Sequence, residues 1–168
     1  MAAPAVVAAY HTLLEDEEIA GASAQALADG QRERRLAFGD RPLCVSLRPN
    51  FIARRLYEAI AVASQRLYGA LGALERSLLA EDDLRRELDL SPEEERLALA
   101  DPGFRASSPS SRLDGFVDGG VIRFVEYNAE SPAGMAYNDE LAAVFDALPV
   151  MRAFGRRYRL RRAPARPR

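Results

Sequence analysis

The sequence contains no lysine, because all 23 of its basic residues are arginine. The lysine that binds phosphate in P-loop proteins and kinases therefore cannot come from these 168 residues. Cysteine and histidine occur once each, as Cys44 and His11. We expect neither a disulfide framework nor a cysteine-based metal site. His11 has no serine or cysteine partner at a catalytic spacing, and we interpret it as structural or surface-exposed.

Long apolar runs are also missing. No stretch approaches the roughly 20 residues that a membrane-spanning helix needs. The opening segment MAAPAVVAAY lacks the basic residues that begin a signal peptide, and an acidic run follows it at 15–18. With 48% hydrophobic residues, 29% charged residues and a net charge of -2, the composition is typical of a soluble globular protein. We expect a cytoplasmic location and no membrane partner.

The first hundred residues show mainly helical periodicity. Helices are predicted over 4–14 and from Asp16 to about Leu36, and Ser91 begins a capping box for a short helix that ends before Pro102. Asn50 is the expected N-cap of a long helix. Its apolar stripe is interpreted as core and comprises Ile52, Leu56, Ile60, Ala63, Leu67, Leu71, Leu74 and Leu78. The run LCVSL at 43–47 reads as a buried strand, with Cys44 as a small core residue.

The pattern changes after residue 103. A serine-rich loop at 104–111 precedes two strand-like runs, Leu113 to Val117 and Val121 to Tyr127. A helix is predicted from Asn138 to Leu148. The order of elements predicts an α+β fold with a helical region at 1–103, a β-hairpin and helix at 104–150, and an arginine- and proline-rich tail at 151–168.

Each strand of the predicted hairpin carries two polar residues on one face. Arg112 and Asp114 are two residues apart and share one face of a strand, as do Glu126 and Asn128 on the next strand. The four meet on one face if the hairpin loop has three residues, 118–120. That loop would pair Arg112 with Glu126.

Two carboxylates, a carboxamide oxygen and an arginine are typical of a magnesium site that also receives phosphate oxygens. The same pattern also fits an exposed strand face that carries an Arg112–Glu126 cross-strand pair, worth only about 0.2–1 kcal/mol. The pattern alone leaves both alternatives open.

The segment RLD at 112–114, followed by VEYNAESPAG at 125–134, resembles the circularly permuted ATP-grasp proteins related to glutathionylspermidine synthase. The resemblance covers roughly residues 110–150. It implies that Asp114, Glu126 and Asn128 are ligands of magnesium ions bound to ATP, and that Arg112 is a catalytic residue that stabilises acyl-phosphate chemistry. It also implies that Ser131 lies in a turn facing the acyl substrate. In this family, later strands supply the adenine pocket and the phosphate-binding lysines.

This resemblance implies the N-terminal portion of an ATP-dependent carboxylate–amine (or thiol) ligase, a truncated ATP-grasp-like domain. Its partners would be a C-terminal ATP-grasp portion or a complementing chain, together with small acyl and amine substrates. The alternative is a non-catalytic binding or interaction domain that keeps the scaffold. For the chain alone we expect no cofactor-binding residues, an open sheet edge with an apolar patch at the hairpin, and a mobile tail after about Phe154.

The arginines of the tail, with Tyr158 beside them, suggest contact with nucleic acid or an acidic membrane surface. The acidic remainder of the sequence, the absence of a nucleic-acid-binding signature, and Pro164 and Pro167 argue against it. We interpret the tail as a connector.

Overall fold

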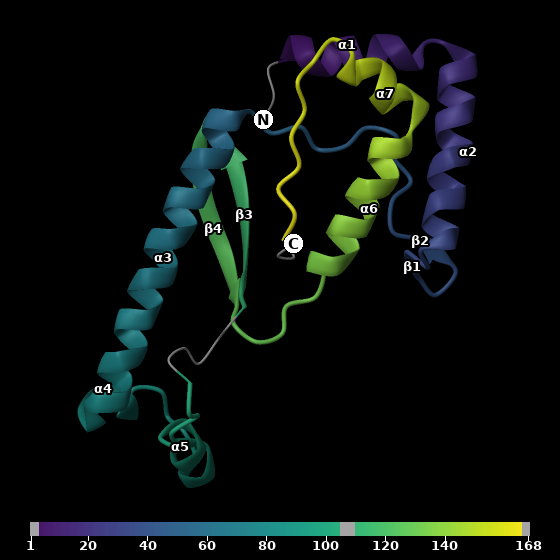
Figure 1. Cartoon of the computed structure of the whole chain (residues 1–168). Coiled ribbons are helices and arrows are strands. Elements are labelled where there is room, and N and C mark those ends of the chain that lie inside the picture. Colours follow the sequence, from purple (N-terminus) through teal and green to yellow (C-terminus); the bar gives the residue numbers. More distant parts are fainter. Residues whose placement is uncertain (1–3, 105–109, 166–168) are drawn as a thin grey trace. The chain divides into compact units, whose positions relative to one another are not determined.

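A computed structural model describes residues 4–104 and 110–165 of the chain, so most of the serine-rich loop and the last three residues lie outside the described part. The fold is α+β, as expected (Figure 1). None of the helices in these two ranges is long and apolar enough to cross a membrane. The elements are α1 (Pro4–Leu14), α2 (Glu17–Glu33), β1 (Ala37–Phe38), β2 (Arg41–Pro42), α3 (Arg54–Ala80), α4 (Asp82–Arg86), α5 (Pro92–Ala98), β3 (Arg112–Asp118), β4 (Val121–Asn128), α6 (Met135–Ala147) and α7 (Pro149–Gly155).

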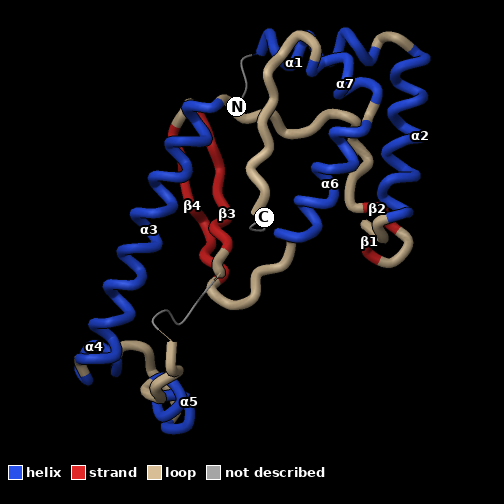
Figure 2. Tube along the Cα trace, viewed as in Figure 1, coloured by secondary structure: helices blue, strands red, loops and turns tan. Residues whose placement is uncertain are grey.

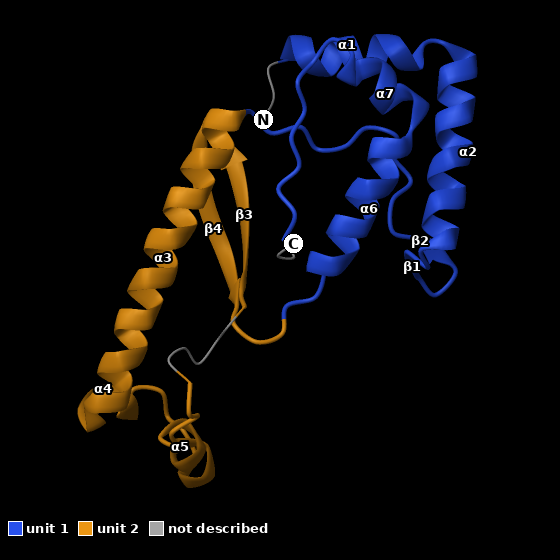
Figure 3. Cartoon of the chain, viewed as in Figure 1, with its two compact units in different colours: residues 1–53, 132–168 blue, residues 54–131 orange. Residues whose placement is uncertain are grey.

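The chain divides into two compact units (Figure 3). Unit 1 comprises residues 1–53 and 132–168, and unit 2 comprises residues 54–131. The division along the chain therefore differs from the expected one, since α6 and α7 join the N-terminal helices and the hairpin groups with α3. The four strands of the described residues form two separate antiparallel pairs, one in each unit (Figure 2).

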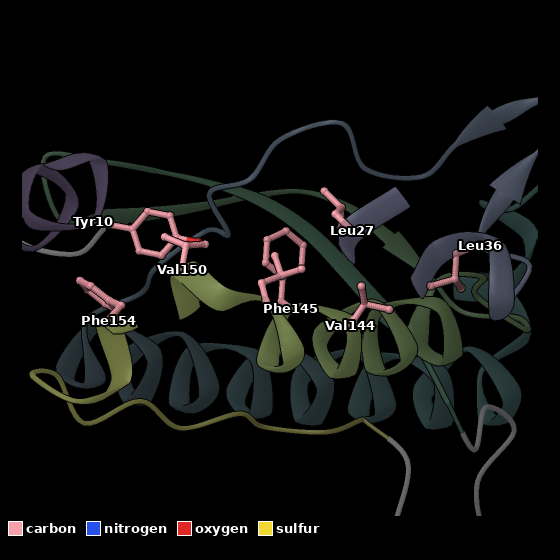
Figure 4. Close-up of a cluster of buried hydrophobic side chains, with 8 residues drawn as sticks. Tyr10, Leu27, Leu36, Val144, Phe145, Val150 and Phe154 are labelled. Carbon is pink, nitrogen blue, oxygen red and sulfur yellow. The ribbon is translucent and has the colours of Figure 1, made fainter. Parts of the chain in front are cut away.

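Unit 1 holds the hydrophobic core of the described residues, which gathers side chains from both of its chain segments (Figure 4). Its fully buried members are Tyr10, Leu27, Leu36, Val144, Phe145, Leu148, Val150 and Phe154. The aromatic rings of Tyr10, Phe51 and Phe154 pack in contact, with centroids 5.1–5.2 Å apart. Gly30 allows α2 to approach α6 closely, since a Cβ there would lie 2.8 Å from a methyl carbon of Val144.

The LCVSL segment is not a strand, contrary to the prediction. The side chain of Gln31 takes the place of a neighbouring strand. Its Nε2 donates to the carbonyl of Cys44 at 2.8 Å, and its Oε1 accepts from the backbone N–H of Cys44 at 2.9 Å. The hydroxyl of Tyr10 donates to the carbonyl of Leu47 at 2.7 Å. The backbone of this segment is thus satisfied by buried side chains rather than by a sheet.

Helix α7 is capped by a residue far away in the sequence. The Oγ of Ser23 on α2, a fully buried residue, accepts the backbone N–H of Val150 in the first turn of α7 at 3.1 Å. This N–H belongs to the group at a helix start that has no partner within the helix. Ser23 therefore ties α2 to α7.

We expect Ser23→Ala to destabilise unit 1 by about 1–3 kcal/mol, because it leaves the buried N–H of Val150 without an acceptor. Urea denaturation followed by far-UV circular dichroism measures the loss. Ala22, next in sequence and on an exposed part of α2, offers the control Ala22→Ser. An unchanged midpoint for Ser23→Ala would contradict the capping role.

The described part of the tail packs on other residues of unit 1, and its expected mobility stays a prediction. Tyr158 stacks on Phe154 with centroids 4.4 Å apart. The Nε of Arg162 lies 2.7 Å from an oxygen of Asp146, and the buried carboxylate of Asp139 accepts the backbone N–H of Ala165 at 3.0 Å. Two acidic residues of α6 thus hold the described part of the tail.

Unit 2 has no buried hydrophobic residue among those described, and the stripe on α3 is not core. The Asn50 cap is also wrong, since α3 begins at Arg54. Among the described residues of this unit, the side chain of Arg85 is buried, and its guanidinium donates to Glu95 at 2.8 Å, to Asp82 at 2.5 Å and to the carbonyl of Leu78 at 3.0 Å. Arg85 thereby joins the end of α3 to α4 and α5. The predicted capping box at Ser91 and Glu94 is confirmed.

Candidate metal-binding site on the β3–β4 hairpin

The loop of the hairpin has two residues, Gly119 and Gly120, and the predicted three-residue loop is wrong. Asp118 is opposite Val121. Both glycines have positive φ, 55° and 82°, the conformation that a type I′ two-residue turn requires and that glycine adopts without a steric cost. This turn matches the right-handed twist of the strands. It also pairs even-numbered residues with odd-numbered ones, which by itself would separate the polar side chains onto opposite faces.

A β-bulge restores the common face. The register shifts between Asp114 and Gly115: Gly115 is opposite Phe124, whereas Asp114 is opposite Glu126. Val125 is therefore the extra residue on β4. Gly115 permits the close approach of the strands here, because a Cβ at this position would lie 2.9 Å from the carbonyl oxygen of Arg123. Beyond the bulge, even-numbered residues face even-numbered ones.

The four polar residues consequently form two directly opposed pairs, Arg112 with Asn128 and Asp114 with Glu126. The predicted pairing of Arg112 with Glu126 is wrong, but the predicted common face is confirmed. Directly opposite residues in an antiparallel pair lie on the same face with Cβ atoms about 4.5–5.5 Å apart. The carboxylates of Asp114 and Glu126 are thus placed where one cation could contact both, directly or through water.

Arg112 makes the strongest contact within this group. Its Nε donates to one carboxylate oxygen of Asp114 at 2.8 Å, and its Nη2 reaches the other oxygen at 3.4 Å. The pKa of Arg112 is raised above its ordinary value, first by the hydrogen bond to Asp114, then by the charge of Asp114 and more weakly by that of Glu126. The side chains of Arg112 and Asp114 are 41% and 39% exposed, so solvent screens this ion pair.

Asn128 has hydrogen-bonding capacity that is not used. Its Nδ2 is buried and has no acceptor within residues 4–104 and 110–165. A 180° rotation of the side-chain amide exchanges nitrogen and oxygen, so the same buried position can present a carbonyl oxygen. An oxygen there completes a donor set of two carboxylates and one amide.

This donor set fits a hard cation that keeps some of its waters. Magnesium is bound in proteins by one or two carboxylates, with water and substrate oxygens in its other positions. The set does not fit a metal that needs three or more strong ligands, since no such cluster of His, Cys, Asp and Glu occurs in the described ranges. The residues that would hold magnesium are Asp114, Glu126 and Asn128.

Ser131 lies three residues beyond Asn128, in the loop after β4. It is exposed and has a left-handed backbone with φ of 41°, which is uncommon for a residue other than glycine. Strained positions of this kind concentrate at functional sites. No hydrogen bond joins Ser131 to the four hairpin residues within the described part of the chain, so its role toward an acyl substrate stays a prediction.

Comparisons with protein-family models, with curated proteins and with solved structures give no match to this chain.

Proposed function

We propose that this chain is the N-terminal portion of an ATP-dependent carboxylate–amine (or thiol) ligase of the circularly permuted ATP-grasp type. The observation that supports the proposal is the presence of two opposed pairs on one hairpin face, Arg112 with Asn128 and Asp114 with Glu126. A β-bulge and a glycine are needed to bring these four side chains together. An ordinary exposed strand face has no need of such a device, and bulges are over-represented beside functional sites.

In this proposal the hairpin holds the cation side of a phosphoryl-transfer site. Magnesium bound with ATP would neutralise the charge of the phosphates while a carboxylate is activated. Asp114 and Glu126 would supply the anionic ligands and Asn128 a neutral oxygen. Arg112 offers a planar fork of N–H groups that suits a phosphate or carboxylate oxygen pair. The adenine pocket and a phosphate-binding lysine would come from a C-terminal portion or a complementing chain, since the 168 residues contain no lysine.

Binding of Mn²⁺, which accepts the same oxygen ligands as Mg²⁺, tests the proposal. In NMR spectra of the whole chain, we expect Mn²⁺ to broaden the amide signals around Asp114 and Glu126 first. Asp114→Asn and Glu126→Gln should each raise the Mn²⁺ concentration needed, because a charged ligand is lost. The affinity should be low in every case, since no substrate phosphates complete the cation's shell.

Asp118→Asn is the matched control. Asp118 lies at the turn end of the same hairpin with an 88% exposed side chain, so its loss should leave the Mn²⁺ response unchanged. Equal effects of Asp118→Asn and Asp114→Asn would show nonspecific attraction to hairpin charge. That result would remove the metal-site proposal.

A non-catalytic interaction domain is the second candidate function. It is favoured by unit 2, where large hydrophobic side chains are exposed on α3, on α5 and on the hairpin. These include Tyr57, Val62, Tyr68, Leu74, Leu97, Phe116, Val121 and Val125. Exposed apolar patches of this kind mark surfaces that bind another protein. Retained stability and partner binding in Asp114→Asn, together with no Mn²⁺ response in the parent chain, would favour this candidate.

A further inference from the structure

The ion pair between Arg112 and Asp114 engages the same carboxylate oxygens that a cation would bind. Both carboxylate oxygens of Asp114 face the guanidinium, at 2.8 Å from Nε and 3.4 Å from Nη2. A divalent cation that takes an oxygen of Asp114 competes with the guanidinium for the charge of that carboxylate. It also approaches a permanent positive charge, because arginine stays protonated at any ordinary pH.

The residues around Asp114 favour replacement of Arg112 by the cation over binding of both at once. On the opposite strand, Glu126 faces Asp114, and Asn128 faces Arg112. The negative charge of Glu126 acts on Arg112 together with that of Asp114. The positive charge of Arg112 therefore acts mainly on Asp114 and more weakly on Glu126. A divalent cation at the same carboxylates would be repelled by the positive charge of Arg112, and solvent screens this repulsion only in part.

We propose that Arg112 is an internal counter-ion of this hairpin site, held by Asp114 until a divalent cation takes the carboxylate. This inference rests on the proposed cation site and adds its regulation. The exchange involves no covalent step: the cation gains an oxygen of Asp114, and the guanidinium loses its hydrogen bonds to that residue. Because the pair is nearly half exposed, water can solvate the released guanidinium.

Arg112→Gln tests the exchange. The substitution removes the competing charge and keeps a shorter, uncharged polar side chain. We expect the Mn²⁺ concentration at half broadening of the hairpin amides to fall about threefold to tenfold. Breaking the exposed Arg112–Asp114 pair costs little free energy, and the variant also loses the repulsion between Arg112 and the cation. Arg112→Lys keeps the positive charge but lacks the planar guanidinium. Its Mn²⁺ concentration at half broadening should lie between those of the parent chain and Arg112→Gln.

Arg123→Gln is the matched control, because Arg123 lies on β4 of the same hairpin and its nearest carboxylate, Asp118, is 3.9 Å away. Its Mn²⁺ response should equal that of the parent chain. Equal responses of the parent, Arg112→Gln and Arg123→Gln would overturn the exchange while leaving the cation site standing. Absence of hairpin broadening in both the parent and Arg112→Gln would overturn the cation site and the exchange with it.

A second measurement uses the unaltered chain and does not depend on a variant that folds. The Nε–H signal of Arg112 in ¹⁵N spectra reports its hydrogen bond to Asp114. Titration with diamagnetic Mg²⁺ should shift this signal toward that of a solvent-exposed arginine, in step with the amides of Asp114 and Glu126. Movement of those amides without any change in the Arg112 signal would show that the cation and the arginine bind together, which contradicts the exchange.

Discussion

Phe154→Ala should lower the free energy of unfolding of unit 1 by about 3–5 kcal/mol, the cost of emptying a closely packed aromatic position. The ring of Phe154 is 1% exposed and lies in contact with Tyr10, Phe51 and Tyr158. Those side chains come from both segments of unit 1, so the cavity cannot close by movement of a single helix. Urea denaturation followed by circular dichroism measures the loss.

Phe116→Ala is the control for this prediction, since it is the same substitution at a 68% exposed ring on the hairpin. It should change the stability by no more than about 0.5 kcal/mol. Hydrogen exchange read by mass spectrometry separates the two units and should show faster exchange in α1, α2, α6 and α7 for Phe154→Ala alone. A similar loss for both variants would contradict the assignment of the core to unit 1.

Alkaline pH should destabilise the chain through Tyr10. Burial raises the pKa of its hydroxyl from 10.0 to about 12. In the unfolded chain Tyr10 loses its proton near pH 10, whereas in the folded chain it keeps the proton up to about pH 12. The stabilisation is therefore complete below pH 10 and is lost as the pH rises from 10 to 12. The two-unit difference in pKa corresponds to about 2–3 kcal/mol.

Tyr10→Phe isolates this contribution. The variant should be less stable below pH 10 by about 1–3 kcal/mol, because the carbonyl of Leu47 loses its donor. Its stability should then vary less with pH than that of the parent, so that the two curves converge toward pH 12. The chain has no lysine, which removes the other common side chain that titrates in this range. Parallel curves for the two proteins would contradict the prediction.

The local signals of the sequence were sufficient for most of the helices. Pro4, Asp16 and the Ser91–Glu94 capping box each mark a helix start that the structure confirms. These signals depend on residues one to four positions apart, and such short-range chemistry survives in almost any tertiary context. The α+β class followed from the same signals.

Hydrogen bonds between residues far apart in the sequence could not be predicted from local patterns. The apolar run at 43–47 has the composition of a strand, but Gln31 supplies both hydrogen bonds that a strand partner would have given to Cys44. The stripe on α3 has a helical period and was correctly read as helix. Periodicity shows that a face is apolar, but it does not show whether other residues of the chain cover that face.

The hairpin face was predicted correctly from a wrong register. Two errors compensated: the loop is one residue shorter than expected, and the bulge residue Val125, opposite the step from Asp114 to Gly115, adds one residue back. An isolated glycine within a strand pattern is a known signal for a bulge, and Gly115 carried it in the sequence. That signal together with a two-residue loop at Gly119 and Gly120 predicts the pairing of Asp114 with Glu126.

The discontinuity of unit 1 has a consequence during synthesis on the ribosome. Tyr10, Ser23 and Leu27 are translated early, but Val150 and Phe154, which cover them, follow only after residues 54–131. At about 5–20 residues per second, that interval lasts roughly 4–16 seconds. The equilibrium cost of closing so long a loop grows only slowly with its length. The emerging chain therefore spends these seconds with its first helices uncovered, and unit 1 folds only after α7 has been translated.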